Sequence, residues 1–430
     1  MISKYTRPEM GRLWTEENKF RVWWEIETLV MEVLASDGRV PVSLAPAMRK
    51  AKAPDPDEIA AVEKRTRHDV IAFLEVATRE LGDDARYVHA GLTSSDLVDT
   101  AQAVRLRQAG LLLDRELGEL ETALAGQADR HRNTVMVGRT HGIHAEPITL
   151  GLKLAVWLDE TRRNRDRLRR AVETVSHGKL SGSVGTFAHV GPHVEAYVCE
   201  RLGLKPAPAS TQIIQRDRVA EFLSTLAIVG GSLEKFATEI RGLQRTEIGE
   251  LEEPFLAGQK GSSSMPHKRN PIICERIAGL ARALRGYALA GFENMALWHE
   301  RDISHSSVER IVLPDACILT DYVTARMTWV IDGLTVNTER MRENLNRTRG
   351  LVFSQRVLIE LMEKGWARSD AYNLVESLAT ETLGGGPDLR ERLKADQQVR
   401  ATANAAEIDG WFDVTKYLQN LEQVYERVGL

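Results

Sequence analysis

Residues 212–250 read QIIQRDRVAEFLSTLAIVGGSLEKFATEIRGLQRTEIGE, and their pattern limits the folds open to this chain. The stretch lacks proline, and its apolar residues recur every three or four positions, as on one face of a helix. These residues are Val219, Phe222, Leu223, Leu226, Val229, Leu233, Phe236, Ile240 and Leu243. One helix over the whole stretch would be roughly 55–60 Å long. Its apolar face must be covered throughout, so the sequence predicts a bundle of long helices, with cover also coming from other subunits.

The rest of the chain gives the same signals. Proline-free windows at 57–146 and 272–313 leave room for further helices, because proline is poorly tolerated inside a helix. Apolar residues between Val22 and Leu34 follow the helical spacing, and Thr15 is placed to cap that helix. Strand signals are scarce, since no alternating run is bounded by Asn-Gly or Asp-Gly. The sequence therefore predicts an all-α fold.

We place domain boundaries near Ser94 and Gly350, where the pattern changes. This division predicts an N-terminal helical domain (1–93), a central domain of long helices (94–350) and a C-terminal helical domain (351–430). A chain of 430 residues is long enough for two or three domains.

Composition excludes several classes of protein. A net charge of −4 provides no general attraction for nucleic acid or for an anionic membrane. The longest weakly polar run, residues 222–233, is too short to cross a bilayer, and the polar N-terminus lacks a signal-peptide core. The three cysteines, Cys199, Cys274 and Cys317, form no CxxC pair, which argues against a disulfide framework. We expect a cytoplasmic protein.

The segment GQKGSSSMPHKRNPI, residues 258–272, has two interpretations. It is either a flexible linker with a basic end or a catalytic loop that acts on an anionic substrate. A linker has no need for Met265-Pro266 between serines and cations, nor for a position between two long helical windows. Lys268 can stabilise a developing carboxylate dianion, and Asn270 adds a neutral donor. Pro271 suits the first turn of a following helix.

Other polar segments interrupt the helical pattern, and each also has a purely structural interpretation. TRHDV (66–70) contains His68, which is also explained as a surface histidine in a charged helical turn. YVHAGLTSSD (87–96) offers hydroxyls and amides at a helix start, which suits either an anion or an ordinary N-cap. WHERDISHSSVER (298–310) combines Arg and Ser near a helix start, which suits a phosphate or a charged helix junction.

VGRTHGIHAEP, residues 137–147, brings His141 and His144 between two glycines. A zinc site is one interpretation, but the remaining ligands are not evident at the spacing of a metal site. We therefore expect no metal and no cofactor.

Taken together, these segments resemble a known family. GSSSMPHKRNP (261–271) resembles the signature GSSxMPxKxNP of the fumarase/aspartase superfamily. The four segments above, with STQIIQRDR (210–218), are similar to those of the bacterial adenylosuccinate lyases, and the resemblance runs nearly end to end. It implies an all-α, three-domain fold with a central bundle of long helices. It also implies a homotetramer in which each active site takes residues from three chains.

The resemblance implies a reaction as well: elimination of fumarate from adenylosuccinate to give AMP, and from the succinyl-carboxamide ribotide of purine synthesis. By match to the family, Ser262 is the base that removes the carbon proton. His141 is the acid that protonates the leaving nitrogen. Loop amides, the start of the following helix and Lys268 are expected to stabilise the serine alkoxide. Glu275 is a candidate to orient His141, and His68 to position His141 or a phosphate.

The same match implies the substrate-binding positions. Thr93, Ser94, Lys268 and Asn270 are expected to face the succinyl carboxylates, and Arg301, Ser306 and Arg310 to hold the nucleotide end. The remaining expected contacts are Lys4, Tyr5, Arg67, His68, Asp69, His89, Gln212 and Arg276. Many relatives carry Arg-Tyr where this chain has Lys4-Tyr5, and lysine cannot make the planar bidentate contact of arginine.

Two alternatives remain. Another lyase of the superfamily, such as an argininosuccinate lyase or a carboxymuconate cycloisomerase, would share the serine loop but is not expected to share TRHD and DISHSSVER. A non-catalytic helical scaffold would be expected to have lost Ser262, His141 or Lys268, and all three are present.

Overall fold

The computed structural model describes residues 2–256 and 258–430 and is predominantly helical, as the sequence predicted. It divides into two compact units. The first comprises Met1–Glu119, Arg162–Lys235 and Arg276–Arg326, and the second comprises Leu120–Thr161, Phe236–Glu275 and Met327–Leu430. The boundaries between the units fall within the longest helices. These are α6 (Ser94–Arg130), α7 (Leu150–Val175), α9 (Asp217–Leu243), α10 (Ile272–Glu293) and α11 (Ser304–Asp332).

The first unit also contains the short helices and strands near the N-terminus and around residue 200. They are η1 (Ser3–Tyr5), α1 (Pro8–Leu13), α2 (Glu16–Ser36), α3 (Leu44–Lys50), α4 (Pro56–Thr66), α5 (Asp69–Ala77), η2 (Arg79–Tyr87), β3 (His177–Gly178), α8 (Pro192–Leu202) and β4 (Lys205–Pro206). Strands β3 and β4 pair in parallel, with His177 opposite Lys205.

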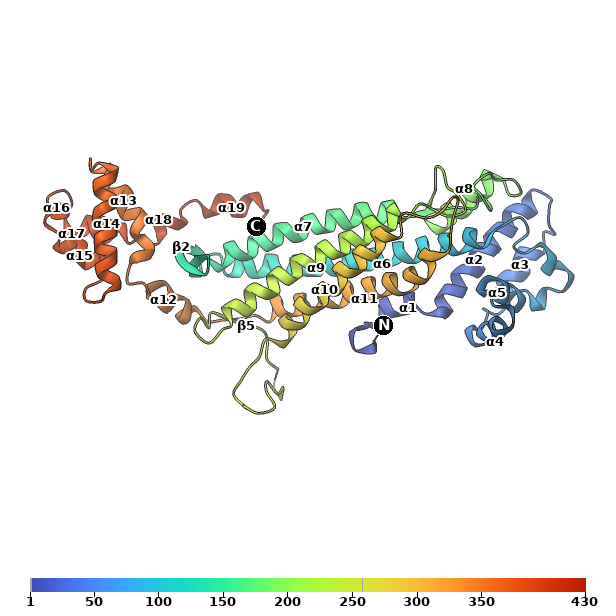
Figure 1. The fold of residues 1–430 in the computed structure, drawn as a ribbon, viewed down its shortest axis with the longest axis horizontal. Coiled ribbons are helices and arrows are strands. Elements are labelled where there is room, and N and C mark those ends of the chain that lie inside the picture. The colour runs from blue at the N-terminus through green and yellow to red at the C-terminus, as the bar shows by residue number, and fades with distance from the viewer. Residues whose placement is uncertain (1, 257) are drawn as a thin grey trace. The chain divides into compact units, whose positions relative to one another are not determined.

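The second unit contains the other short elements. They are β1 (Val135–Thr140), β2 (Ile143–Thr149), β5 (Leu251–Glu252), β6 (Thr335–Val336), α12 (Thr338–Asn346), η3 (Leu351–Phe353), α13 (Ser354–Glu363), α14 (Arg368–Leu383), α15 (Leu389–Ala395), α16 (Gln397–Arg400), α17 (Ala405–Trp411), α18 (Thr415–Leu418) and α19 (Leu421–Arg427). Strands β5 and β6 pair antiparallel. Helices α13 to α17 gather into one group, orange to red in Figure 1.

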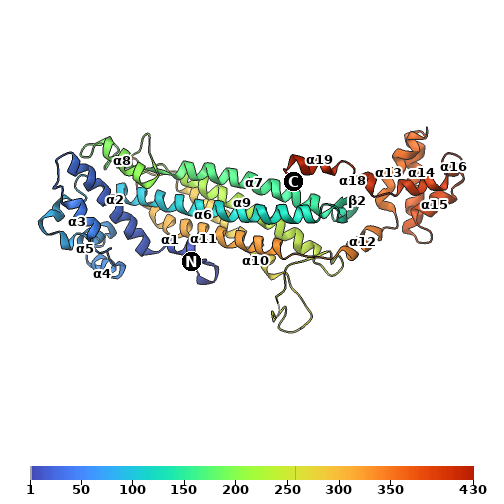
Figure 2. The ribbon, with the colours of Figure 1, turned by 180° about the vertical axis from the view of Figure 1, so that it is seen from behind.

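Each unit has an apolar core of its own. In the first, α2, α5, α8 and the start of α6 bury a cluster that includes Trp23, Phe73 and Leu97. In the second, Val137 of β1 joins a cluster formed mainly by α13 to α17. Within the first unit, the long helices lie side by side (Figures 1 and 2) and approach closely: a Cβ on Gly110 of α6 would lie 2.2 Å from Val172 of α7.

Two helix starts follow the local sequence rules. Thr15 caps α2, and its hydroxyl accepts a hydrogen bond from the Asn18 amide, which confirms the predicted cap. Pro271 directly precedes α10, a position where a missing amide hydrogen has no cost.

The prediction of one helix over residues 212–250 is wrong at both ends, because α9 spans only Asp217–Leu243. Before α9, the Ile214 amide donates to Asp99, and the Arg216 side chain also binds Asp99. These contacts hold the chain out of the helical path. After α9, Gly249 adopts a positive φ of 61° and the chain turns into β5.

A β-hairpin at 135–149 departs from the all-α prediction. Strands β1 and β2 pair antiparallel from Val135↔Thr149 to Thr140↔Ile143, with a register shift between Val137 and Arg139. The turn is His141-Gly142, and both residues have positive φ. The hairpin escaped prediction because its turn is neither Asn-Gly nor Asp-Gly.

Helix α11 also runs through Pro314, against the expectation that prolines end the helices. Pro314 lacks an amide hydrogen and so removes one bond of the helical ladder without ending the helix. No helix in the described part of the chain is long and apolar enough to cross a membrane.

Candidate active site

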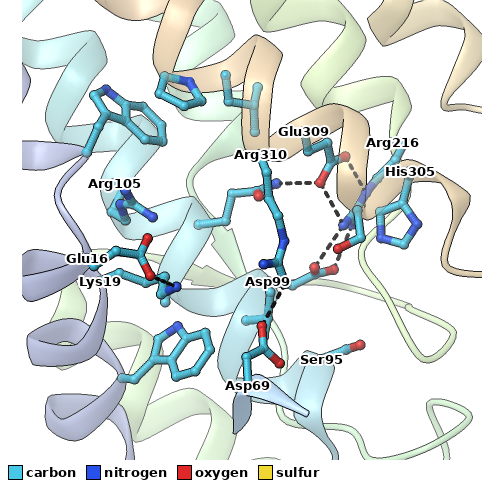
Figure 3. Close-up of a pocket in the computed structure, with 18 of the residues that line it drawn as sticks. Glu16, Lys19, Asp69, Ser95, Asp99, Arg105, Arg216, His305, Glu309 and Arg310 are labelled. Atoms are coloured by element: carbon cyan, nitrogen blue, oxygen red, sulfur yellow. Dashed lines mark hydrogen bonds and ion pairs between the residues drawn. The ribbon is translucent and has the colours of Figure 1, made fainter. Parts of the chain in front are cut away.

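A cavity of about 190 Å³ lies within the first unit (Figure 3). Four of the predicted site residues line it: Asp69, Arg301, Ser306 and Arg310. Trp14, Trp23, Leu313 and Pro314 provide apolar walls. The wall combines cationic side chains with aromatic and apolar surface, and it also carries the carboxylates of Glu16, Asp99 and Glu309. The cationic and aromatic side chains of this lining can bind an anionic ligand that also carries a flat apolar part.

Asp69 and Arg310 join two segments that are far apart in the sequence. The Arg310 guanidinium donates to the Asp69 carboxylate at 2.6 Å (Figure 3). The other carboxylate oxygen accepts from the Val70 amide at 2.8 Å. Asp69 begins α5, and Arg310 lies in the second turn of α11. The TRHDV and WHERDISHSSVER segments therefore meet at one cavity.

A buried ion-pair network lies behind this cavity, and the sequence analysis missed it. Arg216 donates to Asp99 at 2.7 and 2.9 Å and to Glu309 at 2.8 Å (Figure 3). Burial raises the pKa of Asp99, but the charge and hydrogen bonds of Arg216, together with the hydrogen bond from the Ile214 amide, lower that pKa overall. For Glu309 burial prevails and the pKa is raised. The sequence gives one clue to this network: Arg216 lies inside the STQIIQRDR segment and Glu309 inside the SSVER segment.

His305 belongs to the same wall. Burial and the nearby Arg216 charge lower its pKa to about 4, so the imidazole is neutral near pH 7. Its Nδ1 lies 3.1 Å from the Asp302 carbonyl oxygen. Gln212 approaches from the segment before α9, where its side-chain oxygen accepts from Arg301 at 3.1 Å.

The Thr93-Ser94 pair lies at the start of α6. The Thr93 amide donates to Asp96 at 2.9 Å, and the buried Lys179 ammonium donates to the other carboxylate oxygen of Asp96. Asp96 also accepts from the Gly182 amide at 3.2 Å. This buried pair fixes the turn that carries Thr93 and Ser94. Asp96 is the last residue of the YVHAGLTSSD segment, but the sequence did not predict the role of its carboxylate or its pairing with Lys179.

His68 and His89 occupy different settings in the first unit. His68 caps α5, with Nδ1 accepting from the Ile71 amide at 3.4 Å, and it is exposed. Arg67 precedes it at a positive φ of 55°, at the end of α4. His89 is partly buried and pairs with Glu27 of α2, a residue that the sequence analysis did not consider.

Lys4 and Tyr5 lie in η1, next to another predicted residue. The Tyr5 ring packs against Tyr322 with centroids 5.1 Å apart, and the Arg276 guanidinium lies 5.9 Å from the Tyr5 centroid. Arg276 also donates to the Tyr322 hydroxyl at 2.8 Å. The first unit therefore brings Tyr5 and Arg276 together.

In the second unit, Ser262 is partly buried, and its hydroxyl is held by the amides of its own loop. Its hydroxyl oxygen accepts from Ser264 at 3.3 Å and from Met265 at 3.2 Å. Asn270 folds the loop back, because its side-chain amide donates to the Gly261 carbonyl at 2.9 Å. A Cβ on Gly261 would lie 2.1 Å from the Lys268 carbonyl oxygen, so this close approach requires glycine.

The start of α10 does not serve Ser262 in the way that we expected. The amides of Ile273 and Cys274 donate to the Glu253 carboxylate at 3.0–3.1 Å. Those donors of the first turn are therefore occupied by Glu253, and the amides that contact the serine are those of the loop. Lys268 is exposed and lines an open hollow beside this loop, and Glu275 is exposed in the first turn of α10.

His141 lies at the tip of the β1–β2 hairpin, exposed and at a positive φ of 54°. The hairpin is anchored by Arg139, which donates to the buried Glu250 at 2.9 and 2.6 Å. Across residues 2–256 and 258–430, no hydrogen bond or ion pair joins His141 to Ser262 or to Glu275. The same residues contain no group of three or more His, Cys, Asp or Glu placed to hold a metal ion.

Comparison with known proteins gives matches over almost the whole chain. A family model described as lyase matches residues 3–286, and one described as adenylosuccinate lyase C-terminus matches residues 350–428. The chain is 50% identical over 431 residues to the adenylosuccinate lyase of Synechocystis sp., and 47% identical over 430 residues to that of Bacillus subtilis. Both alignments cover 100% of each protein.

Solved structures show the same fold. The 3-carboxy-cis,cis-muconate lactonizing enzyme from Pseudomonas putida matches with a TM-score of 0.90 and 32% identity, over 99% of this chain and 96% of that one. A fumarate lyase from Mesorhizobium sp. matches with a TM-score of 0.90 and 28% identity, over 99% and 98%. Since the full-length relatives at 45–50% identity are adenylosuccinate lyases, the chain belongs to the adenylosuccinate lyase family.

Proposed function

We propose that this lyase eliminates fumarate from adenylosuccinate to give AMP, and from the succinyl-carboxamide ribotide (SAICAR) to give AICAR. The observation that carries the proposal is the 45–50% identity to adenylosuccinate lyases over the whole chain. The cavity of the first unit, with Arg301 and Arg310 in its wall, supports a substrate that carries a phosphate.

In the proposed reaction, a base removes a proton from the carbon next to a carboxylate. The electron pair left on that carbon forms the double bond of fumarate, while the neighbouring carbon–nitrogen bond breaks. The leaving nitrogen takes a proton from an acid. Because negative charge develops on the carboxylate before the bond breaks, fixed cations and hydrogen-bond donors around that carboxylate accelerate the step.

Ser262 is the proposed base. A serine hydroxyl removes a carbon proton only if its alkoxide is stabilised. The amides of Ser264 and Met265 already donate to this oxygen, and hydrogen bonds to the charged form of a group favour that form. Lys268, from the same loop, is the proposed cation for the serine and for the carboxylate. Thr93, Ser94 and Asn270 are the proposed neutral donors to the carboxylates.

His141 is the proposed acid, and Glu275 is proposed to orient it. An imidazole has an ordinary pKa of about 6.5 and can donate a proton near neutral pH. Within residues 2–256 and 258–430, no hydrogen bond or ion pair joins His141 to Ser262, which supports a site that draws the two residues from different subunits.

The nucleotide end is proposed to lie against the cavity of the first unit. Arg301, Ser306 and Arg310 would bind the phosphate, and Gln212 orients Arg301 by accepting its hydrogen bond. The other proposed contacts of the substrate are Lys4, Tyr5, Arg67, His68, Asp69, His89 and Arg276.

A homotetramer with active sites shared among three chains is part of the proposal. Leu111 of α6, Ile228 of α9, and Leu289 and Phe292 of α10 expose 51%, 48%, 61% and 53% of their surface. Large apolar side chains exposed along long helices are favoured when another subunit covers them. The proposal retains the three domains 1–93, 94–350 and 351–430, with support from the C-terminal family match that begins at residue 350. It also retains a cytoplasmic location, since the three cysteines are free and buried.

One other reaction has a specific observation in its favour. The muconate lactonizing enzyme shares the fold at 32% identity, so cycloisomerisation of a carboxymuconate is the second candidate. The test is to add adenylosuccinate to the purified protein and follow the ultraviolet change as the purine loses its succinyl group. Argininosuccinate and 3-carboxy-cis,cis-muconate serve as comparison substrates. The proposal predicts turnover of adenylosuccinate, and turnover of a comparison substrate alone would refute it.

A further inference from the structure

A buried carboxylate lies directly behind His89. Glu27 is part of α2, its exposed fraction is 0%, and it is surrounded by core residues such as Trp23 and Val30. Its carboxylate accepts from the backbone amide of His89 at 3.1 Å, and its other oxygen lies 2.6 Å from Nδ1 of the His89 ring. Glu27 therefore holds both the backbone and the ring of one residue.

The backbone around His89 makes this arrangement rigid. His89 has a positive φ of 66°, which is rare for a residue other than glycine. Gly91 follows with a φ of 84°, and a Cβ at that position would lie 2.9 Å from the Cβ of His189. The turn is thus fixed on both sides, and with Nδ1 committed to Glu27, Nε2 is the ring nitrogen left to contact a ligand.

Charge balance favours an imidazolium at this position. A buried carboxylate is strongly unfavourable without a positive partner. Within residues 2–256 and 258–430, Glu27 forms its ion pair with His89. Burial of the ring lowers the pKa of His89, but the hydrogen bond and charge of Glu27 outweigh burial, and the pKa is raised overall.

Other charged groups around the turn do not reverse this balance. Asp96 of α6 also raises the pKa of His89, although its carboxylate is paired with Lys179. On the opposite side, His189 packs against Gly91, and Arg39 donates to the His189 carbonyl at 3.1 Å.

We propose that Glu27 is a positioning residue that keeps His89 as an imidazolium and directs its Nε2–H toward an anionic group of the substrate. The inference rests on the proposed function, because it assumes that His89 faces the substrate. Two groups of adenylosuccinate share the required chemistry: the nucleotide phosphate and a succinyl carboxylate. A neutral His89 with Nδ1–H bound to Glu27 would offer only a lone pair at Nε2, which would repel either anion.

The experiment compares the unaltered protein with Glu27→Gln, which keeps the shape but removes the charge. Glu32→Gln is the matched control, because Glu32 is also on α2 but contacts Arg49 and Tyr197. Mass spectrometry of deuterium exchange at the imidazole carbon between the two nitrogens gives the titration midpoint of His89 in the intact protein. Inhibition by AMP and by fumarate is then measured separately at pH 6 and pH 8.

The inference predicts that Glu27→Gln lowers the His89 midpoint and weakens inhibition by one of the two ligands about tenfold at pH 8. Weaker AMP binding would identify the phosphate, and weaker fumarate binding would identify a carboxylate. Glu32→Gln should change neither quantity. An unchanged midpoint in Glu27→Gln, or unchanged inhibition by both ligands, would overturn the inference.

Two features keep this test decisive. The exchange midpoint does not depend on turnover, so it separates failure of the Glu27–His89 inference from failure of the proposed function. If Glu27→Gln does not fold, His89→Gln replaces it: inhibition of the unaltered protein should weaken as pH rises through the His89 midpoint, and His89→Gln should lack this change. The same pH profile in both proteins would overturn the inference.

Discussion

The Asp69 carboxylate and the Arg310 guanidinium form an ion pair at 2.6 Å, although 241 positions separate them in the chain. The pair connects α5 to α11 at the edge of the cavity (Figure 3). Asp69 engages one end of a guanidinium that has five N–H donors, so it orients Arg310 while leaving donors for a ligand.

Replacement of Arg310 should weaken substrate binding. We expect Arg310→Gln to raise KM for adenylosuccinate about tenfold or more, since a hydrogen bond to a charged group contributes about 1.5–3 kcal/mol. Arg310→Lys should recover only part of this loss, because lysine lacks the planar fork. Steady-state kinetics measure the effect, with Arg342→Gln, an exposed arginine on α12, as the control. An unchanged KM in Arg310→Gln would remove this residue from the site.

Gly261→Ala should damage the loop that carries Ser262. The added Cβ would lie 2.1 Å from the Lys268 carbonyl oxygen, so the loop must open. We expect turnover to fall by about tenfold or more, because a misplaced catalytic group reduces the rate steeply. Circular dichroism should show unchanged helix content. Gly279→Ala on α10 is the matched control, since no atom lies within 4 Å of its added Cβ, and it should keep full activity. Equal activities of the two variants would show that the loop geometry is unimportant.

His305 should make the protein less stable in mild acid. Its pKa is about 4 in the folded chain, against about 6.5 when unfolded. Between these values the unfolded chain binds a proton that the folded chain does not, so stability falls as pH decreases from 6.5 toward 4. We expect His305→Gln to show a smaller difference in urea midpoint between pH 7 and pH 5 than the unaltered protein, at equal protein concentration. An equal difference would contradict the buried, neutral state of this imidazole.

Subunit mixing tests whether active sites are shared. Ser262→Ala and His141→Gln proteins should each be nearly inactive. If one site takes these residues from different chains, mixed oligomers contain some sites with neither substitution and should regain activity. Recovery is measured after dissociation and reassembly, with mass spectrometry to prove exchange. No recovery in proven mixed oligomers would place both residues on one chain.

Much of the fold follows from local sequence rules. The cap at Thr15 and the helical spacing that follows it depend only on neighbouring residues, and both are present in α2. The extent of α9 could not be predicted in this way, because Asp99 holds Ile214 and Arg216 out of the helix from more than 100 positions away. The β1–β2 hairpin was missed because its turn, His141-Gly142, is neither Asn-Gly nor Asp-Gly.

In the candidate site, too, some features depend on neighbouring residues and others on residues far away in the chain. Motifs single out Ser262 and Arg310 as candidate site residues, since the residue types and their spacing are local properties of the sequence. The carboxylates that support such motifs lie elsewhere: Glu253 takes the first amides of α10, and Glu27 holds His89. Glu27 did have one signal in the sequence, because it is a charged residue one turn after Trp23 on an otherwise apolar helix face.

The rate of Ser262→Ala on adenylosuccinate, compared with that of Ser264→Ala, tests the assignment of Ser262 as the base most directly. The two substitutions remove neighbouring hydroxyls of one loop and leave the amides in place. We predict that Ser262→Ala loses at least about a hundredfold in kcat, the lower range for a general base, while its oligomer and helix content are unchanged. Ser264→Ala should stay close to the unaltered rate. A Ser262→Ala protein that turns over as fast as Ser264→Ala would contradict the assignment.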